Sequence, residues 1–227
     1  SKYKESAAGA YYHLYNRGVE KRIIFNEEHD YSVLLSFLKE YLLPKKEKEL
    51  QEVILNPQSG WREKAQAIKL LRLNNFADEI TLLAYCLMPN HFHFLIKQNS
   101  ENAIDRFMNS LCTRYTMFFN TKYKRVGPLY QSQYKAVLVD SDEQLLYLTS
   151  YAHRNPLGEN LALKGNALQS YLLSQPSSLP EYLGQRKTEW VHPEEILAHF
   201  SKTNPLLSYQ SFVEQTDDFS FIKDGLI

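Results

Sequence analysis

The sequence predicts an α+β protein, a ferredoxin-like split βαβ sandwich in which an antiparallel sheet carries its helices on one face. Segments with strand-like alternation and segments with helical periodicity follow each other in the order β-α-β-β-α-β-α over residues 10–155. The second and third strand-like segments along the chain are joined only by Met88-Pro89-Asn90, which suits the tight turn of a hairpin. This order allows two βαβ units to interlock in one sheet.

Length and composition favour one domain with additions. The chain has 227 residues, of which 44% are hydrophobic and 23% charged, enough to bury a full core. We expect a core domain at residues 1–160 with a helical insertion at about 45–80, and a C-terminal helical extension at 161–227. Cys86 and Cys112 form no CxxC pair, and no run approaches ~18 apolar residues. These features predict reduced thiols, a cytoplasmic location and no membrane span.

The first half of the chain predicts one strand, one helix and the insertion. The strand is expected at Ala10–Arg17, and Asn26 offers an N-cap for a helix that ends before Pro44. Residues 45–80 combine a charge run, a Pro-Gln-Ser-Gly breaker and a short amphipathic helix at 61–73. We interpret this segment as an inserted helical excursion, acting either as a lid or contact arm or as a solvated spacer.

The second half supplies the remaining elements. Strands are expected at 80–87, 91–97 and 134–139, with a long helix at about 101–120. The last core helix is expected at 141–155, where Ser141 precedes Gln144 by three residues, the spacing of a capping box.

His91 and His93 stand two residues apart in the third expected strand. Because successive side chains of a strand alternate, both imidazoles share one face while Phe92 and Phe94 point to the other, toward the core. Two imidazoles on a rigid strand can supply two ligands of a metal site. The spacing alone is weak, since seven histidines give about 0.2 such pairs by chance. The alternative is a surface pair of strand histidines.

A polar row on the last core helix can complete such a site. Tyr147, Tyr151 and Asn155 follow each other at i, i+4 and i+8. Pro156 disfavours helical backbone at the residue before it, so Asn155 is expected at the helix end with its amide directed outward. The amide can be the third ligand of a hard cation, and the phenol of Tyr151 can be a nucleophile. The alternatives are an ordinary amphipathic-helix tyrosine and a C-terminal cap.

The formal net charge is zero, but basic residues cluster along the chain. Residues 106–135 contain six Lys or Arg and no Asp or Glu, interleaved with tyrosines. Cations that follow phosphates and rings that stack on unpaired bases are typical of single-strand binding. The candidate nucleic-acid-binding residues are Arg114, Tyr115, Lys122, Lys124, Arg125, Tyr130, Gln131, Tyr134 and Lys135.

With these motifs, the chain resembles the single-tyrosine HUH transposases, and in particular the bacterial REP-associated tyrosine transposases. The resemblance runs through five ordered blocks, at residues 12–18, 84–93, 114–120, 127–136 and 151–156. It covers most of residues 10–160, and five blocks in order are far more specific than His-x-His alone.

The resemblance implies an activity and roles for the candidate residues. His91 and His93 would bind a divalent metal, Mg²⁺ or Mn²⁺, with Asn155 completing the site and Tyr151 as the catalytic tyrosine. Residues 1–160 would then be a catalytic domain that cleaves and rejoins DNA through a 5′-phosphotyrosine. The implied partner is single-stranded DNA beside a small hairpin. The insertion at 45–80 departs from compact members, which leaves both a monomer and a homodimer open.

Two other classes of function are compatible with parts of the pattern. A non-catalytic nucleic-acid-binding module on a ferredoxin-like sheet would make Tyr151 dispensable while Arg114 and Lys124 remained essential. A metal-dependent hydrolase would use the two histidines with water as nucleophile. No Asp or Glu lies close to the histidine pair in the sequence, and no HExxH motif is present, which disfavours the hydrolase.

Overall fold

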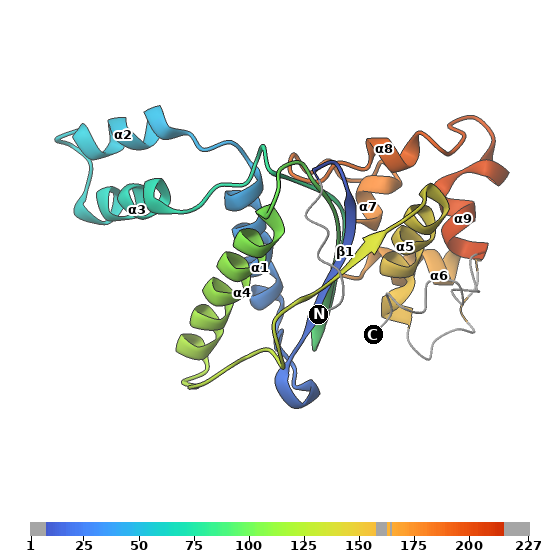
Figure 1. Cartoon of the computed structure of the whole chain (residues 1–227), viewed down its shortest axis with the longest axis horizontal. Helices are drawn as coiled ribbons and strands as arrows, with labels where there is room; N and C mark the ends of the chain where they lie inside the picture. The colour runs from blue at the N-terminus through green and yellow to red at the C-terminus, as the bar shows by residue number, and fades with distance from the viewer. Residues whose placement is uncertain (1–7, 158–162, 164, 216–227) are drawn as a thin grey trace.

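The computed structural model describes residues 8–157, 163 and 165–215 (Figure 1). Residues 161, 162, 164 and 216–227 of the predicted extension lie outside this range, as do residues 1–7 and 158–160 of the predicted core domain. Four strands form one antiparallel sheet in the order β2-β3-β1-β4. The strands are β1 (Tyr11–Arg17), β2 (Ile80–Met88), β3 (His91–Gln98) and β4 (Lys135–Val139). This order is that of the predicted split βαβ sandwich.

The two crossover helices lie on one face of the sheet, as predicted. They are α1 (Glu28–Leu42) and α4 (Ala103–Lys122), and they pack against alternate residues of the strands. Phe92 and Phe94 of β3 are fully buried in this cluster with Leu34 of α1 and Phe107 of α4. The face predicted to point to the core therefore does so, because burying these side chains removes the largest apolar area from water.

A second helical layer covers the opposite face of the sheet (Figure 1). It begins with α5 (Asp142–Arg154), the last predicted core helix, and continues through the C-terminal extension. Leu83, Ala84 and Leu95 on this face are buried against the extension and α5, which gives the predicted appendage a structural role. The helices of the extension are α6 (Gly165–Leu173), α7 (Leu179–Tyr182), α8 (Glu194–Leu197) and α9 (Tyr209–Gln215). Short 3₁₀ turns lie at Val19–Lys21, Asn155–Leu157 and Pro205–Leu207.

Hydrogen bonds fasten α5 to the extension. The ring nitrogens of His153 lie 2.7 Å from the hydroxyl of Tyr209 and 2.8 Å from that of Ser178. Arg154 donates from Nη1 to the carbonyl of Val213 at 2.7 Å. Complete burial lowers the pKa of His153 to about 3, so its imidazole is neutral and serves as a hydrogen-bonding spacer. Helix α5 is therefore held between the sheet and the C-terminal layer.

The insertion forms a helical hairpin that projects from the body of the molecule (Figure 1). It consists of α2 (Glu47–Leu55) and α3 (Trp61–Arg72). The sequence predicted α3 but not α2, whose Lys/Glu run is rich in good helix formers and carries a 3.2 Å Lys46–Glu49 ion pair. At the base, Lys45 donates to the carbonyls of Leu71 and Leu73. A role as contact arm or spacer stays a prediction.

Helix starts follow the sequence rules in one case and depart from them in another. At α5, the Ser141 hydroxyl accepts a hydrogen bond from the backbone N–H of Gln144, as the capping pattern predicts. At α1, Asn26 is not the N-cap, and that prediction was wrong. Its backbone N–H instead donates to Asp30 at 2.8 Å.

No helix in the described ranges is long and apolar enough to cross a membrane.

The carboxylate of Asp30 joins the start of α1 to the end of α4. It is fully buried and accepts hydrogen bonds from the Asn26 backbone, from Lys122 at 2.5 Å and from the Tyr123 hydroxyl at 2.7 Å. Burial by itself would raise the pKa of Asp30, but the donors around it hold the pKa below its ordinary value.

We expect Asp30→Asn to lower the free energy of unfolding by roughly 2–4 kcal/mol at pH 7, because Lys122 loses its buried partner. The folded-state pKa of Asp30 lies below the unfolded one, so its stabilisation is complete above about pH 4 and lost as the pH falls through the folded value. Urea denaturation at several pH values should show the difference between wild type and variant shrinking on acidification. The exposed Glu28→Gln is the control, and a difference that stays constant to low pH would contradict the assignment.

Candidate metal and tyrosine site

The site lies on the sheet face that α5 covers. Strands β1 and β3 pair antiparallel, with Tyr15 opposite His93 and Arg17 opposite His91. Directly paired residues project to the same side of a sheet, so the four side chains share one face. His91 and His93 are buried there, at 8% and 0% exposure, with the phenylalanines on the other side as predicted.

His93 has one ring nitrogen engaged and one without a partner. Its Nδ1 lies 2.8 Å from Nε2 of His13, a residue of β1, and the two rings stack with centroids 5.0 Å apart. Its Nε2 is buried and has no hydrogen-bond partner in the described part of the chain. Burial lowers the pKa of His93 well below its ordinary value, and the neighbouring His13 adds to the effect. In the tautomer whose Nδ1 donates to His13, the neutral imidazole offers Nε2 as a ligand.

His91 is arranged in the same way. Its Nδ1 lies 2.6 Å from the amide oxygen of Asn90, so Nδ1 donates and Nε2 keeps its lone pair. The pKa of His91 is lowered to about 4, first by burial and next by the charge of Arg17, while a hydrogen bond with the Asn155 side chain opposes the shift. At neutral pH, His91 is therefore uncharged and in contact with Asn155.

Tyr151 faces this histidine pair from α5. Its half-buried ring meets the His93 ring edge-on, with centroids 5.5 Å apart, and the His13 ring at 6.2 Å. Asn155 is the C-cap of the same helix, four residues further on. Its backbone is helical rather than extended, yet its amide reaches His91 as expected. One chain therefore brings together Tyr151, His91, His93 and Asn155.

The side chains fit a divalent cation, provided that the third ligand is an amide. Among the residues that the structure describes, no group of three or more His, Cys, Asp or Glu side chains could hold a metal ion. The Nε2 atom of His13 is hydrogen bonded to His93, so this nitrogen does not serve as a third ligand. The donors that remain are the two imidazoles and the oxygen of Asn155, a mixture of nitrogen and oxygen ligands that suits Mn²⁺ and admits Mg²⁺.

Sequence reasoning missed His13 and Arg17. Both come from β1 and lie on the histidine face only because β1 pairs with β3 in this register. Their spacing along β1 carries a signal, since His13, Tyr15 and Arg17 alternate with the buried Tyr12 and Leu14. Pairing that alternation against His91 and His93 would have identified them.

Two of the predicted nucleic-acid contacts, Tyr115 and Tyr130, lie in the core. Tyr115 is fully buried, and its hydroxyl donates to the carbonyl of Ile24 at 2.6 Å. Tyr130 is 9% exposed and packs edge-on against Phe92. Both rings belong to the core between α4 and the sheet, so neither can stack on a base without unfolding that layer. Tyr115 is buried because the helical spacing places it on the same side of α4 as Leu111 and Phe119.

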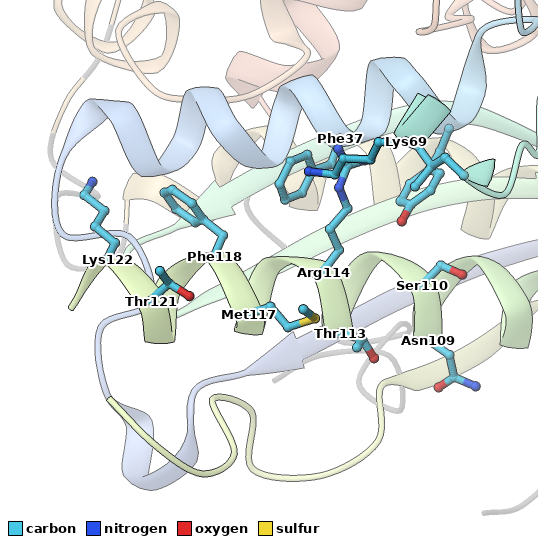
Figure 2. Close-up of a pocket in the computed structure, with 12 residues that line it drawn as sticks. Phe37, Lys69, Asn109, Ser110, Thr113, Arg114, Met117, Phe118, Thr121 and Lys122 are labelled. Atoms are coloured by element: carbon cyan, nitrogen blue, oxygen red, sulfur yellow. The ribbon is translucent and has the colours of Figure 1, made fainter. Parts of the chain in front are cut away.

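Two other predicted contacts, Arg114 and Lys122, lie on α4, across the sheet from the histidines. Arg114 points toward Phe37 of α1, with its guanidinium carbon 3.7 Å from the ring centroid, and pairs with Glu40 at 2.6 Å (Figure 2). It lines a groove of about 870 Å³ bounded by α1, α3 and α4. Lys122 is bound to Asp30. These two cations already have anionic partners within the protein.

The remaining predicted contacts are dispersed. Lys124 and Gln131 are exposed between α4 and β4, and Arg125 donates to Asn120 at 2.7 Å. Tyr134 donates to Asp105. Lys135 alone among the nine belongs to the histidine face, because it pairs with Tyr15 in the sheet and its ammonium lies 5.7 Å from the centre of that ring. The structure therefore does not unite these residues in a single surface.

Residues 61–155 of the chain match the model of a protein family described as "Transposase IS200 like". Among solved structures, the chain is similar to that of a REP-associated tyrosine transposase bound to a REP hairpin, with a TM-score of 0.45 and 9% identity over 85% of this chain and 97% of that one. No curated protein matches the chain. The family match spans the His-x-His strand and the helix with Tyr151, and it confirms the resemblance to the single-tyrosine transposases that the sequence motifs predict.

Proposed function

We propose that the chain cleaves and rejoins single-stranded DNA, with Tyr151 as nucleophile and Mg²⁺ or Mn²⁺ held by His91, His93 and Asn155. The observation that carries the proposal is the contact of the Tyr151 ring with His93, whose buried Nε2 lacks a partner within the described residues. The matched family of transposases supports the reaction class. A binding module would have no need for a tyrosine beside an imidazole nitrogen that is buried at a cost and left unsatisfied.

Tyr151 would carry the DNA strand between cleavage and rejoining. Its phenolic oxygen attacks the scissile phosphorus, the bond from phosphorus to the 3′-oxygen breaks, and that oxygen leaves as a 3′-hydroxyl after taking up a proton. The 5′-phosphate stays esterified to Tyr151. Attack by a 3′-hydroxyl on this ester restores a phosphodiester and the phenol, so no nucleotide triphosphate is consumed.

The side chains around Tyr151 would prepare this step. When bound, the cation would polarise a non-bridging phosphate oxygen. His91 and His93 are neutral at pH 7, so their lone pairs are free for that ion, and His13 and Asn90 fix which nitrogen each presents. Asn155 stands one helical turn from Tyr151, which keeps the third ligand and the nucleophile in fixed register.

The site needs no second subunit to be complete, because Tyr151 and His93 of the same chain are in contact. A monomer is therefore sufficient for cleavage, and a homodimer would serve other steps. We propose single-stranded DNA beside a small hairpin as substrate, on the sequence resemblance to the REP-associated transposases. Residues 1–160 would be the catalytic domain, with the extension holding α5 in place through His153 and Arg154.

We expect Tyr151→Phe to abolish the covalent protein–DNA adduct while binding of single-stranded DNA is unchanged, since only the attacking oxygen is lost. The measurement is a denaturing gel with labelled single-stranded DNA, including strands that flank hairpins, and Mg²⁺ or Mn²⁺. Tyr147→Phe, one turn earlier on α5 and packed against Phe212, is the matched control and should retain the adduct.

Any other result of this experiment would indicate a different function or a different nucleophile. Cleavage by the wild type without any adduct would indicate a hydrolase. Binding without cleavage would indicate a non-catalytic module. An adduct that persists in Tyr151→Phe would place the nucleophile on another residue.

We expect His13→Leu to weaken Mn²⁺ binding by about 10–100-fold, because His93 loses the partner that orients its ring and sets its tautomer. His93→Ala should weaken binding more, since it removes a ligand. Titration calorimetry with Mn²⁺ on the DNA-free protein measures both effects without depending on cleavage. The exposed His29→Gln serves as control, and unchanged Mn²⁺ affinity in His13→Leu would refute the role of His13.

A further inference from the structure

We propose that Arg17 binds the phosphate of the DNA strand at the site and positions it beside Tyr151; this rests on the proposed function. Arg17 is the last residue of β1 and stands opposite His91 in the register of the sheet. Its side chain therefore lies on the face that carries His91 and His93. The charge of Arg17 acts on both imidazoles, as expected of a cation close to the pair.

Among the arginines that the structure describes, Arg17 alone combines a buried nitrogen that makes no hydrogen bond with the lack of a carboxylate partner. Its Nε is buried and makes no hydrogen bond, and no carboxylate pairs with it within the described residues. By contrast, Arg114 pairs with Glu40, Arg186 pairs with Glu181, and Arg154 donates to backbone carbonyls. A buried donor without a partner is costly to the fold, which indicates that its partner is a bound ligand.

The surroundings of Arg17 favour an anion. The four strands contain no Asp or Glu, and their basic residues other than histidine are Arg17, Lys97 and Lys135. Lys97 is bound to Glu195 at the other end of this sheet face, opposite Tyr11. Lys135 is exposed beside Tyr15, two positions along β1 from Arg17. The basic strand residues at the histidine end of this face are therefore Arg17 and Lys135.

The planar shape of the Arg17 guanidinium indicates which ligand it would bind. A guanidinium presents a planar fork of N–H donors that matches two oxygens of one phosphate group, whereas an ammonium offers a point charge. A phosphate held by Arg17, next to His91, would be within the same site as the Tyr151 hydroxyl. Arg17 would then bind the strand before metal arrives and neutralise part of the charge that develops on the phosphate.

The test compares Arg17→Gln, Arg17→Lys and the control Lys97→Gln, which removes the same charge from the far end of the same face. Binding of a fluorescein-labelled single-stranded 30-mer is followed by anisotropy in EDTA, in the Tyr151→Phe background, at several salt concentrations. We expect Arg17→Gln to weaken binding about tenfold and to reduce the slope of log affinity against log salt by ~0.7. Arg17→Lys should keep the slope but recover only part of the affinity, and Lys97→Gln should leave both unchanged.

Thermal unfolding separates a binding role from a structural one. Removing a half-buried cation whose Nε makes no hydrogen bond should leave the melting temperature of Arg17→Gln equal to or above that of the parent, and a marked fall would assign Arg17 to the fold instead. Unchanged affinity and slope in Arg17→Gln, or the same loss in Lys97→Gln, would overturn the proposal. The outcome is independent of the adduct assay, so absence of an adduct in the wild type would overturn the proposed function while binding still decides on Arg17.

Discussion

The antiparallel pairing of β1 with β3 is the constraint on which the site depends. It places His13 and Arg17 of one strand beside His91 and His93 of the other, on a face that the turn at Pro89 and Asn90 then closes at one end. Slipping the register by one residue would turn the imidazoles into the core and bring the phenylalanines out. Burial of Phe92 and Phe94 against α1 and α4 therefore fixes the orientation of the histidines, although those rings do not contact the site.

The second constraint is the support of α5 from both sides. A helix on the outer face of a four-stranded sheet would bury only one stripe, and its far side would be wet. Here, the extension covers that far side, with Tyr209 and Ser178 bonded to His153. Tyr151 lies two residues from this anchor, so its ring is held against His93 by packing on both sides of the helix. In the proposed role of nucleophile, a tyrosine held in this way would lose little entropy on reaching the reacting geometry.

The sequence was sufficient for the sheet, the crossover helices, and the joint location of Tyr151, Asn155 and the two histidines, because each depends on a local period of two or 3.6 residues. It was insufficient wherever the position of a side chain depends on which distant segments pack against each other. The tyrosines at 115 and 130 have the composition of a stacking surface, and only the packing of α4 shows that they are core. His13 and Arg17 became visible only through strand register, a contact between residues about eighty positions apart. The α2 helix was missed for a different reason, since a Lys/Glu run is read equally well as solvated coil.

Charge pairing divides the cations of this protein into those that hold the fold and those that can meet a ligand. Arg114 and Lys122 lie across the sheet from Tyr151, and each is bound to a carboxylate of α1, so a phosphate approaching them would compete with Glu40 or Asp30. Opening the Lys122–Asp30 pair would expose a carboxylate that is now fully buried, at a cost to the packing of α1 on α4. On the histidine face, Arg17 has no carboxylate partner among the described residues with which a phosphate would compete. Under the proposed function, a DNA strand would therefore bind the face with the tyrosine, even though the basic residues are richest in sequence on the helix behind it.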